Sequence, residues 1–329
     1  MSAVAPVLEA FFTERLARQR NASPHTVAAY RDAFRLLLAF AQEQTGKAPS
    51  ALDFSALDAP YVACFLEHLE HERHNSVRTR NARLAAVRSF YRFAAFREPA
   101  HAELIRRVLA IPEKRTRRTV VSFLTADEIK ALLASPDRTT WRGRRDHALL
   151  ATAAQTGVRV SELTALCNRD VVLGSGAHVL VHGKGRKERV TPLTHSTVAV
   201  LATWMKERCG GPEDALFPTS RGTLLSRDAV ADLVAKHAAT AERHSPSLSA
   251  KRVTPHVLRH SSAMALLHAG VDTSVIALWL GHEHVQSTQI YLHGDLSIKE
   301  RALARTAPQD TPPGRYRPPD KLLAFLEGL

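Results

Sequence analysis

The sequence has few of the features that mark secreted, disulfide-stabilised or membrane-spanning proteins. Its 329 residues include three cysteines, Cys64, Cys167 and Cys209, whose wide spacing excludes a disulfide framework and a cysteine-based zinc site. No apolar run approaches the roughly 18 residues that a membrane-spanning helix needs. The first twenty residues also lack the basic start, apolar core and cleavage site of a signal peptide. We therefore expect a cytoplasmic protein.

Acidic residues are scarce relative to basic ones. The chain has 45 Lys and Arg against 32 Asp and Glu, which gives a formal net charge of +13 at pH 7. This excess favours a polyanionic partner, with nucleic acid the first candidate. Ribosomal, secreted and membrane-surface proteins can be equally basic, so charge alone does not decide the function. The hydrophobic content of 45% is normal for a globular protein and excludes wholesale disorder.

Helical patterns dominate the first third of the chain. The length favours two domains over one. Ser23 and Pro24 predict the N-cap and first position of a helix, and further helices are expected near Pro60 and from Ser76. We therefore predict an N-terminal helical bundle over residues 1–110.

The helix expected from Ser76 is rich in arginine. An apolar stripe of Leu84, Val87 and Tyr91 is expected to face the core. The remaining surface carries five arginines with no carboxylate between them: Arg78, Arg80, Arg83, Arg88 and Arg92. Such a run is usually a solvated face, but repulsion among like charges on one helix favours an anionic partner here.

Residues 111–121 are predicted to link two domains. They contain a proline and a basic cluster, opposed by one carboxylate, Glu113. The cluster consists of Lys114, Arg115, Arg117 and Arg118. A segment of this kind suits contact with a phosphate backbone.

The second domain is expected to be mainly helical with a small β element. A helix around residues 146–155 is predicted to end at Gly157. Two β-type runs within residues 177–193 flank a Gly-Lys-Gly-Arg-Lys turn, which predicts a hairpin. The expected fold class is therefore mainly α, with an α+β second domain that contains a small hairpin or sheet.

One predicted helix start places a histidine and an arginine on the same face. Thr254 and Pro255 predict the N-cap and first residue, so His256 and Arg259 lie one turn apart near a helix N-terminus, which attracts anions. A surface histidine and arginine on an ordinary amphipathic helix would give the same pattern. His256 and His260 also have a metal-ligand spacing, but no HExxH arrangement accompanies it, so we do not expect zinc.

Two further cationic residues lie at turns. Arg159 follows the turn at Gly157, with Glu162 three residues later, so its fork could point rigidly into a cleft or form a structural ion pair. Lys184 lies between two glycines in the predicted hairpin turn, which lacks the P-loop pattern and gives no support for ATP or GTP use. Lys184 could reach a phosphate or a leaving oxygen, or it could belong to a merely basic hairpin tip.

The last candidate segment contains a histidine and a tyrosine. Gly281 is predicted to end a helix, His282 follows at once, and Tyr291 comes nine residues later. A tyrosine between two aliphatic residues is more often part of a core than a nucleophile.

Taken together these segments form an ordered set: TGxRxSE, a lysine in a glycine-rich hairpin turn, HxxRH at a helix start, LGH, and a tyrosine nine residues on. The set resembles the tyrosine recombinase (phage integrase) family over about residues 122–300, and its Xer-like bacterial members most closely. The stretch SPHTVAAYRDAFRLLLAF is similar, more weakly, to the family's core-binding domain. The resemblance implies a SAM-like DNA-binding domain over residues 1–110, a catalytic domain over 122–305, and a C-shaped clamp around double-stranded DNA.

The resemblance also implies the chemistry. Tyr291 resembles the nucleophile that attacks the scissile phosphate, which leaves a 3′-phosphotyrosine and a free 5′-hydroxyl. Arg159 and Arg259 resemble the pair that clamps the non-bridging oxygens. Two arginines and a helix N-terminus offset the charge of the attacked phosphate without a metal. Because phosphotyrosine keeps the energy of the backbone bond, no ATP or other cofactor is expected.

Three more residues match the family's proton-transfer and hydrogen-bonding positions. Lys184 resembles the general acid that protonates the 5′ leaving oxygen. His256 resembles a general acid/base for the tyrosine proton, and His282 a hydrogen-bond donor to the phosphate. A phenol titrates near ~10, so Tyr291 needs both a proton acceptor and nearby cations at neutral pH.

The resemblance implies an assembly as well, a homo- or hetero-tetramer of protomers on DNA. The tail, residues 306–329, is a proline-rich spacer followed by KLLAFLEGL, which suits docking on a neighbouring protomer. A tail that folds back on its own domain is the alternative. The biological task could be transposition or integration of a mobile element, or chromosome or plasmid resolution.

Two other functions share parts of this pattern. A type IB topoisomerase-like enzyme would nick and reseal DNA with the same residue types, but the N-terminal helices and the LGH motif favour recombination. A non-catalytic DNA-binding accessory protein would be equally basic, but such a protein should have lost a catalytic position, and every diagnostic position is filled here.

Overall fold

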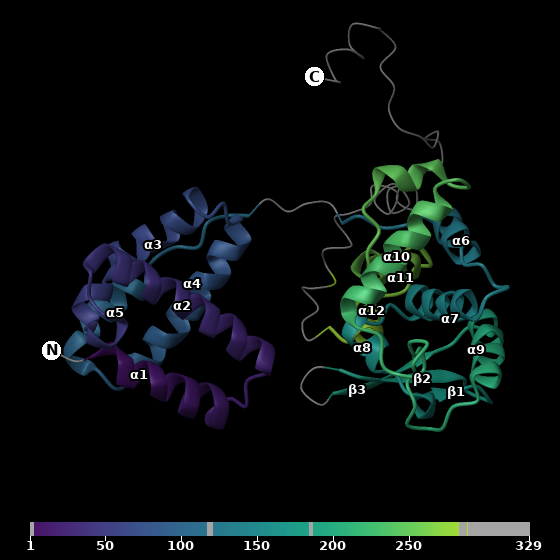
Figure 1. Ribbon diagram of the computed structural model, residues 1–329, viewed down its shortest axis with the longest axis horizontal. Coiled ribbons are helices and arrows are strands. Elements are labelled where there is room, and N and C mark those ends of the chain that lie inside the picture. Colours follow the sequence, from purple (N-terminus) through teal and green to yellow (C-terminus); the bar gives the residue numbers. More distant parts are fainter. Residues whose placement is uncertain (1–2, 117–120, 184–186, 283–287, 289–329) are drawn as a thin grey trace, which may run out of the picture. The chain divides into compact units, whose positions relative to one another are not determined.

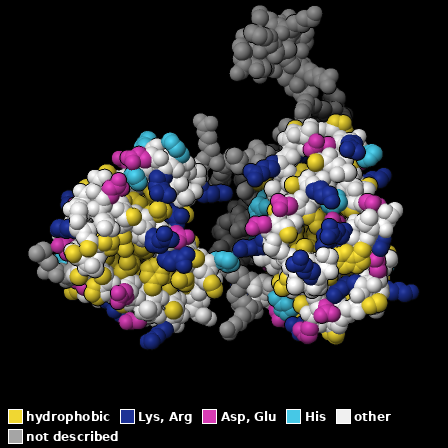
Figure 2. Space-filling view, in the orientation of Figure 1, with side chains coloured by type: hydrophobic (Ala, Val, Ile, Leu, Met, Phe, Trp, Pro, Cys, Tyr) yellow, Lys and Arg dark blue, Asp and Glu magenta, His cyan; other side chains and the backbone are white. Residues whose placement is uncertain are grey.

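The computed structural model describes residues 3–116, 121–183, 187–282 and 288. The chain divides into two compact units, Met1–Arg118 and Thr119–Leu329 (Figure 1). Figure 2 shows lysine and arginine side chains spread over the visible face of each unit. Among the described helices, none combines the length and the apolar character that crossing a bilayer requires.

The described part of the first unit is helical, apart from an isolated bridge between Ala3 and Asp53. Ser23 caps its helix as predicted, and Ser76, where a helix was predicted to start, is the N-cap of the next one. Each side-chain oxygen accepts a hydrogen bond from a backbone N–H three residues later. The helices are α1 (Val4–Ala10), a π-helix (Phe11–Gln19), α2 (Pro24–Thr45), α3 (Ala59–His71), α4 (Val77–Ala94) and α5 (Ala102–Leu109), with 3₁₀ turns at Pro49–Ala51, Phe54–Leu57 and Pro99–His101.

Aromatic side chains form the centre of this unit. Phe90 of α4 lies with its ring centroid 5.3 Å from that of Phe34 and 5.7 Å from that of Phe11. Tyr91 is fully buried and donates its hydroxyl hydrogen to the carbonyl of Leu57 at 2.6 Å. Burial raises the pKa of Tyr91, so this hydroxyl remains a neutral donor. The apolar stripe predicted on α4 is confirmed.

The arginine face predicted on α4 is partly wrong. Arg80 is 6% exposed and donates through Nη1 to the carbonyl of Pro112 at 3.0 Å. Arg88 pairs with Glu113 at 3.1 Å and donates to the carbonyl of Ile111. Both side chains therefore hold the start of the predicted linker against α4.

A third arginine of that face is also engaged, since Arg83 donates to the carbonyl of Ala29 in α2 at 3.0 Å. Arg78 and Arg92 are exposed, as predicted. The helix pattern alone could not distinguish the two groups, because the partners of the engaged arginines lie at distant positions in the sequence.

The second unit combines helices with a small antiparallel sheet, so the predicted fold class is confirmed. The predicted hairpin is present, with β2 and β3 paired from His178 opposite Pro192 to His182 opposite Glu188. A third strand, β1, extends the sheet in the order β1-β2-β3; its two residues are too few to show a sequence pattern. The strands are β1 (Val171–Val172), β2 (His178–His182) and β3 (Glu188–Pro192).

Helix α7 lies at the centre of this unit (Figure 1). It contacts α6, α9 and α11, and Leu149 and Leu150 are at most 1% exposed. Asp146 of α7 accepts two hydrogen bonds from Arg145 and lies 3.0 Å from Nε2 of His237 in α10. The helices are α6 (Ala126–Ala134), α7 (Trp141–Thr156), α8 (Val160–Ala165), α9 (His195–Arg208), α10 (Arg227–Ala241), α11 (Pro255–His268) and α12 (Thr273–Leu280), with 3₁₀ turns at Asn168–Asp170 and Pro246–Ala250.

The end of α7 meets the end of α12. Gly157 closes α7 in the left-handed conformation, at φ 63°, as its sequence position predicted. Trp279 of α12 donates its indole N–H to the carbonyl of Thr156 at 3.1 Å. Two turns far apart in the sequence are thereby fixed side by side.

Replacing Gly157 with alanine is expected to destabilise this junction. A Cβ would lie 2.7 Å from Cδ2 of Leu280 and 2.9 Å from Oγ of Ser262, and the positive φ adds strain. We expect the free energy of unfolding to fall by about 2 kcal/mol or more in a denaturant titration.

Gly222→Ala is the matched control. Its φ of 80° carries a similar backbone strain, but a Cβ there would enter open space. Equal losses of unfolding free energy in the two variants would show that the clash of the added Cβ with Leu280 and Ser262 contributes nothing to the destabilisation.

Candidate active site

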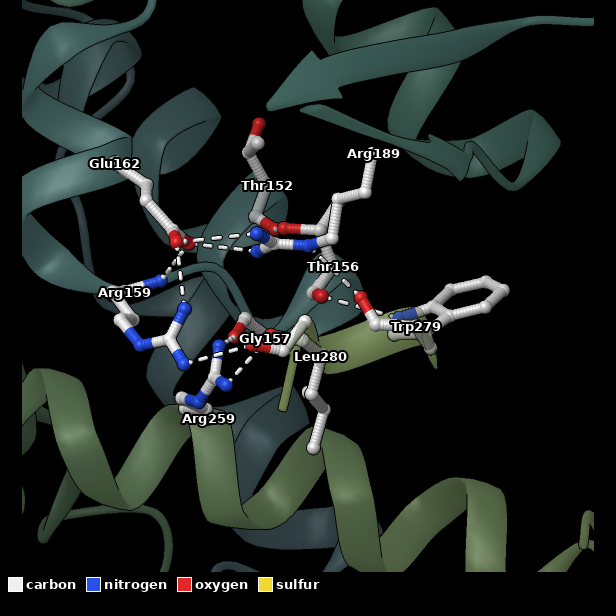
Figure 3. Close-up of polar contacts among 10 residues, drawn as sticks. Thr152, Thr156, Gly157, Arg159, Glu162, Arg189, Arg259, Trp279 and Leu280 are labelled. Atoms are coloured by element: carbon white, nitrogen blue, oxygen red, sulfur yellow. Dashed lines mark hydrogen bonds and ion pairs between the residues drawn. The ribbon is translucent and has the colours of Figure 1, made fainter. Parts of the chain in front are cut away.

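Arg259 connects α11 to the ends of α7 and α12. The N-cap Thr254 and Pro255 start α11 as predicted, so Arg259 lies in its second turn and points inward. Its guanidinium donates to the carbonyl of Gly157 and to the carbonyl of Leu280, each at 2.7 Å (Figure 3). The residue is 3% exposed. These hydrogen bonds help to hold a buried cation in a fixed orientation.

Arg159 lies beside Arg259 in Figure 3 and approaches from the start of α8. Its Nη2 donates to the carbonyl of Gly281 at 3.0 Å, and its Nη1 donates to Glu162 at 2.8 Å. The side chain is 39% exposed, so it can still meet a ligand. The structure therefore brings together the two arginines that the sequence pattern singled out.

A third arginine, which the sequence analysis missed, completes this cluster. Arg189 of β3 donates to both carboxylate oxygens of Glu162, at 3.1 and 2.7 Å, and to the carbonyl of Trp279 at 3.1 Å (Figure 3). Burial acts to raise the pKa of Glu162, but hydrogen bonds from Arg189 and from Arg159 outweigh it and hold the pKa below its ordinary value. Glu162 is therefore an ionised carboxylate shared by two arginines.

A signal for Arg189 was present in the hairpin itself. In the observed register Arg189 is opposite Val181 and Thr191 is opposite Val179, and both valines are fully buried. The face of β3 that carries Arg189 therefore turns inward, whereas Val190 is 57% exposed. A strand whose polar residues face inward indicates a buried polar partner.

Three histidines lie in the field of these cations. Partial burial lowers the pKa of His256, and Arg259 and Arg159 lower it further. Partial burial is the main cause that lowers the pKa of His282 to about 4, and the positive charges of the same two arginines contribute next. The pKa of His260, whose ring centroid is 4.3 Å from that of His256, is also lowered to about 4, by burial first. All three imidazoles are therefore neutral at pH 7.

His282 has a partner that the sequence analysis did not identify. Its Nδ1 lies 2.8 Å from Oγ1 of Thr288, which is fully buried. A hydroxyl at Nδ1 fixes the orientation of the ring, and when it donates its hydrogen it leaves Nε2 as the N–H donor.

The other two predicted site residues, Lys184 and Tyr291, lie outside the described residues. The base of the hairpin turn is described, and there the N–H of Gly183 donates to the carbonyl of Lys187 at 2.7 Å. Within the described ranges no group of three or more potential metal ligands occurs.

The lowered histidine pKa values make stability depend on pH. For His260 the pKa is 6.5 in the unfolded chain and about 4 in the folded chain, so between these values the unfolded chain binds the extra proton. Stability is then lost as the pH falls through this window. His260→Gln removes the titrating group and should reduce the drop in melting temperature between pH 6.5 and 4.

The exposed His195 at the start of α9 supplies the control. His195→Gln should retain the pH dependence of the parent. If His260→Gln also retains it, the folded environment of His260 does not oppose its protonation.

Comparison with known proteins places this chain in a family. The family model described as "Phage integrase family" matches residues 122–297, and "Phage integrase, N-terminal SAM-like domain" matches residues 10–98. A Sinorhizobium fredii protein, y4rC, whose name describes it as an integrase/recombinase, is 55% identical over 328 residues, which cover 100% of this chain and 99% of that protein.

A more distant relative supports the same family, and a solved structure shares the fold. Tyrosine recombinase XerC of Pelobacter propionicus is 35% identical, over 87% of this chain and 90% of that protein. The crystal structure of the XerH site-specific recombinase bound to a palindromic difH substrate shares the fold, with a TM-score of 0.68 at 22% identity, over 87% of this chain and 81% of that one. The chain therefore belongs to the phage integrase family of tyrosine recombinases, and it is a DNA-binding integrase/recombinase.

Proposed function

We propose that this recombinase cleaves and rejoins double-stranded DNA at specific sites through a 3′-phosphotyrosine at Tyr291. The convergence of Arg159 and Arg259 on the ends of α7 and α12 is the observation that supports this most strongly. A phosphodiester under attack gathers negative charge on its equatorial oxygens. Arginines that are already oriented stabilise that charge without reorganisation during the reaction. The pair is therefore suited to hold the scissile phosphate.

In the proposed step the tyrosine oxygen bonds to phosphorus and the bond from phosphorus to the 5′ oxygen breaks. The phenolic proton passes to His256, which can accept it because its lowered pKa keeps the imidazole neutral. The ammonium group of Lys184 supplies the proton for the leaving oxygen. The neutral His282 donates a hydrogen bond to the phosphate through Nε2, with Thr288 at the other ring nitrogen. The reverse of this step rejoins the strands, so no ATP or metal is needed.

We further propose that residues 1–110 and 122–305 are the DNA-binding and catalytic domains of a C-shaped clamp, joined by residues 111–121. The family models match segments inside both ranges. Contacts from α4 to Ile111, Pro112 and Glu113 anchor the start of the connecting segment on the first domain.

Recombination between two DNA sites requires a tetramer of protomers, and we propose that residues 306–329 connect neighbouring copies. A groove of about 560 Å³ between α6, α7 and α9 is lined by Ile129, Leu133 and Val200, with the exposed Lys130 and Arg138 among its lining residues. The segment KLLAFLEGL matches it with apolar residues and one glutamate. Its docking there would couple the activities of adjacent protomers. The recombination would then serve either a mobile element or the resolution of chromosomes or plasmids.

Tyr291→Phe tests the chemistry. The parent protein should form a covalent adduct with the 3′ side of the break in a nicked suicide DNA substrate. The variant should form none, because it lacks the attacking oxygen, while its affinity for DNA stays within about threefold of the parent. Denaturing gel electrophoresis detects the adduct. Its persistence in the variant would reject Tyr291 as the nucleophile.

Removal of residues 322–329 tests the assembly. Cleavage of an isolated site should continue, whereas recombination between two sites should fall at least about tenfold if docking couples the protomers. Ala134→Glu, at an exposed position in the groove, should act in the same direction by repelling the tail's glutamate. Unchanged recombination in both variants would contradict docking in this groove.

A further inference from the structure

Three consecutive carbonyls, from the last two residues of α12 and its C-cap Gly281, each receive a hydrogen bond from a different arginine. Arg189 donates to Trp279, Arg259 donates to Leu280, and Arg159 donates to Gly281. The three arginines come from β3, α11 and the start of α8 (Figure 3). A helix leaves its final carbonyls without helical partners and favours cations there. Arg189 therefore belongs to the same cluster as the two proposed phosphate-binding arginines.

Arg189 differs from the other two in its second partner. Both of its Nη atoms donate to Glu162, and Oε1 of Glu162 also accepts from Nη1 of Arg159. Glu162 thus lies between the two guanidinium groups. The side chain of Arg189 is 11% exposed and that of Arg159 is 39% exposed, so Arg159 is the more accessible of the two to a substrate.

We infer that Arg189 is a positioning residue for strand cleavage, an inference that rests on the proposed function. Arg189 balances part of the negative charge of Glu162, so the positive charge of Arg159 is not fully neutralised and can act on the phosphate. Without Arg189 the buried carboxylate would have Arg159 as its remaining guanidinium partner. The two charges would then cancel at the position where the reaction needs a cation.

The same residue also connects the hairpin to the site. Arg189 lies five residues after Lys184 and binds the carbonyl of Trp279, three residues before His282. Gly281 allows this close approach, since a Cβ there would lie 2.9 Å from Nη1 of Arg189. Loss of Arg189 would therefore release both Glu162 and the contact between β3 and α12.

Four variants test the charge argument: Arg189→Gln, Arg189→Lys, Glu162→Gln and the double variant of Arg189→Gln with Glu162→Gln. At saturating protein, Arg189→Gln should slow single-turnover cleavage of the suicide substrate at least about tenfold, with DNA affinity changed less than about threefold. The double variant should cleave faster than Arg189→Gln, because removing the carboxylate frees Arg159 from neutralisation. Arg189→Lys, which retains the charge, should keep more activity than Arg189→Gln.

Arg144→Gln is the matched control. Arg144 donates to both oxygens of Glu207 at 2.7 Å and to the carbonyls of Arg138 and Thr139, so its loss breaks a similar set of contacts elsewhere in the unit. It should cleave at the parental rate. Melting temperatures show whether each variant is folded. If Arg189→Gln is not folded, Arg189→Lys is compared with the parent in its place.

Two results would overturn the inference. One is parental cleavage by Arg189→Gln. The other is a double variant as slow as Arg189→Gln or slower, since a purely structural role makes losses of buried contacts accumulate. Absence of an adduct from the parent would instead overturn the proposed function.

Discussion

The geometry of the candidate active site depends on the hydrogen bonds that the carbonyl groups at the end of α12 accept. The carbonyls of its last two residues and of its C-cap Gly281 each accept a hydrogen bond from an arginine that another segment supplies. Each hydrogen bond gives a helix-end carbonyl a donor and also fixes the position of the arginine that donates it. The helix end and the cationic cluster therefore stabilise each other. Because the donors come from β3, α11 and the start of α8, the cluster forms only when these segments pack together.

Concentrating positive charge in one place has consequences for its neighbours. Partial burial and then the arginines lower the pKa of His256 and His282, which keeps both neutral and suits one of them to accept a proton and the other to donate a hydrogen bond. Glu162 is the counter-charge that makes three close guanidinium groups compatible with a folded structure. An anionic phosphate would reduce the remaining repulsion, so the cluster is electrostatically suited to bind one.

Local rules account for much of the fold and part of the site. The caps at Ser23, Ser76 and Thr254 and the helix ends at Gly157 and Gly281 follow from side-chain and backbone preferences of single residues. The hairpin followed from two β-type runs around a glycine-rich turn. The motif order, through its resemblance to the tyrosine recombinases, singled out Arg159, Arg259, His256 and His282 as candidates, and these residue types suit the chemistry of a phosphate.

The sequence by itself indicated the family, several helix starts and ends, and the chemical types of the candidate residues. Tertiary structure decided which charged side chains face solvent and which are held inside. Arg80 and Arg88 were predicted on an exposed face but secure the segment after α5. Arg189 was not among the predicted site residues but shares Glu162 with Arg159. The reason is physical: a buried charge is stable only with partners, and those partners lie tens of residues away along the chain.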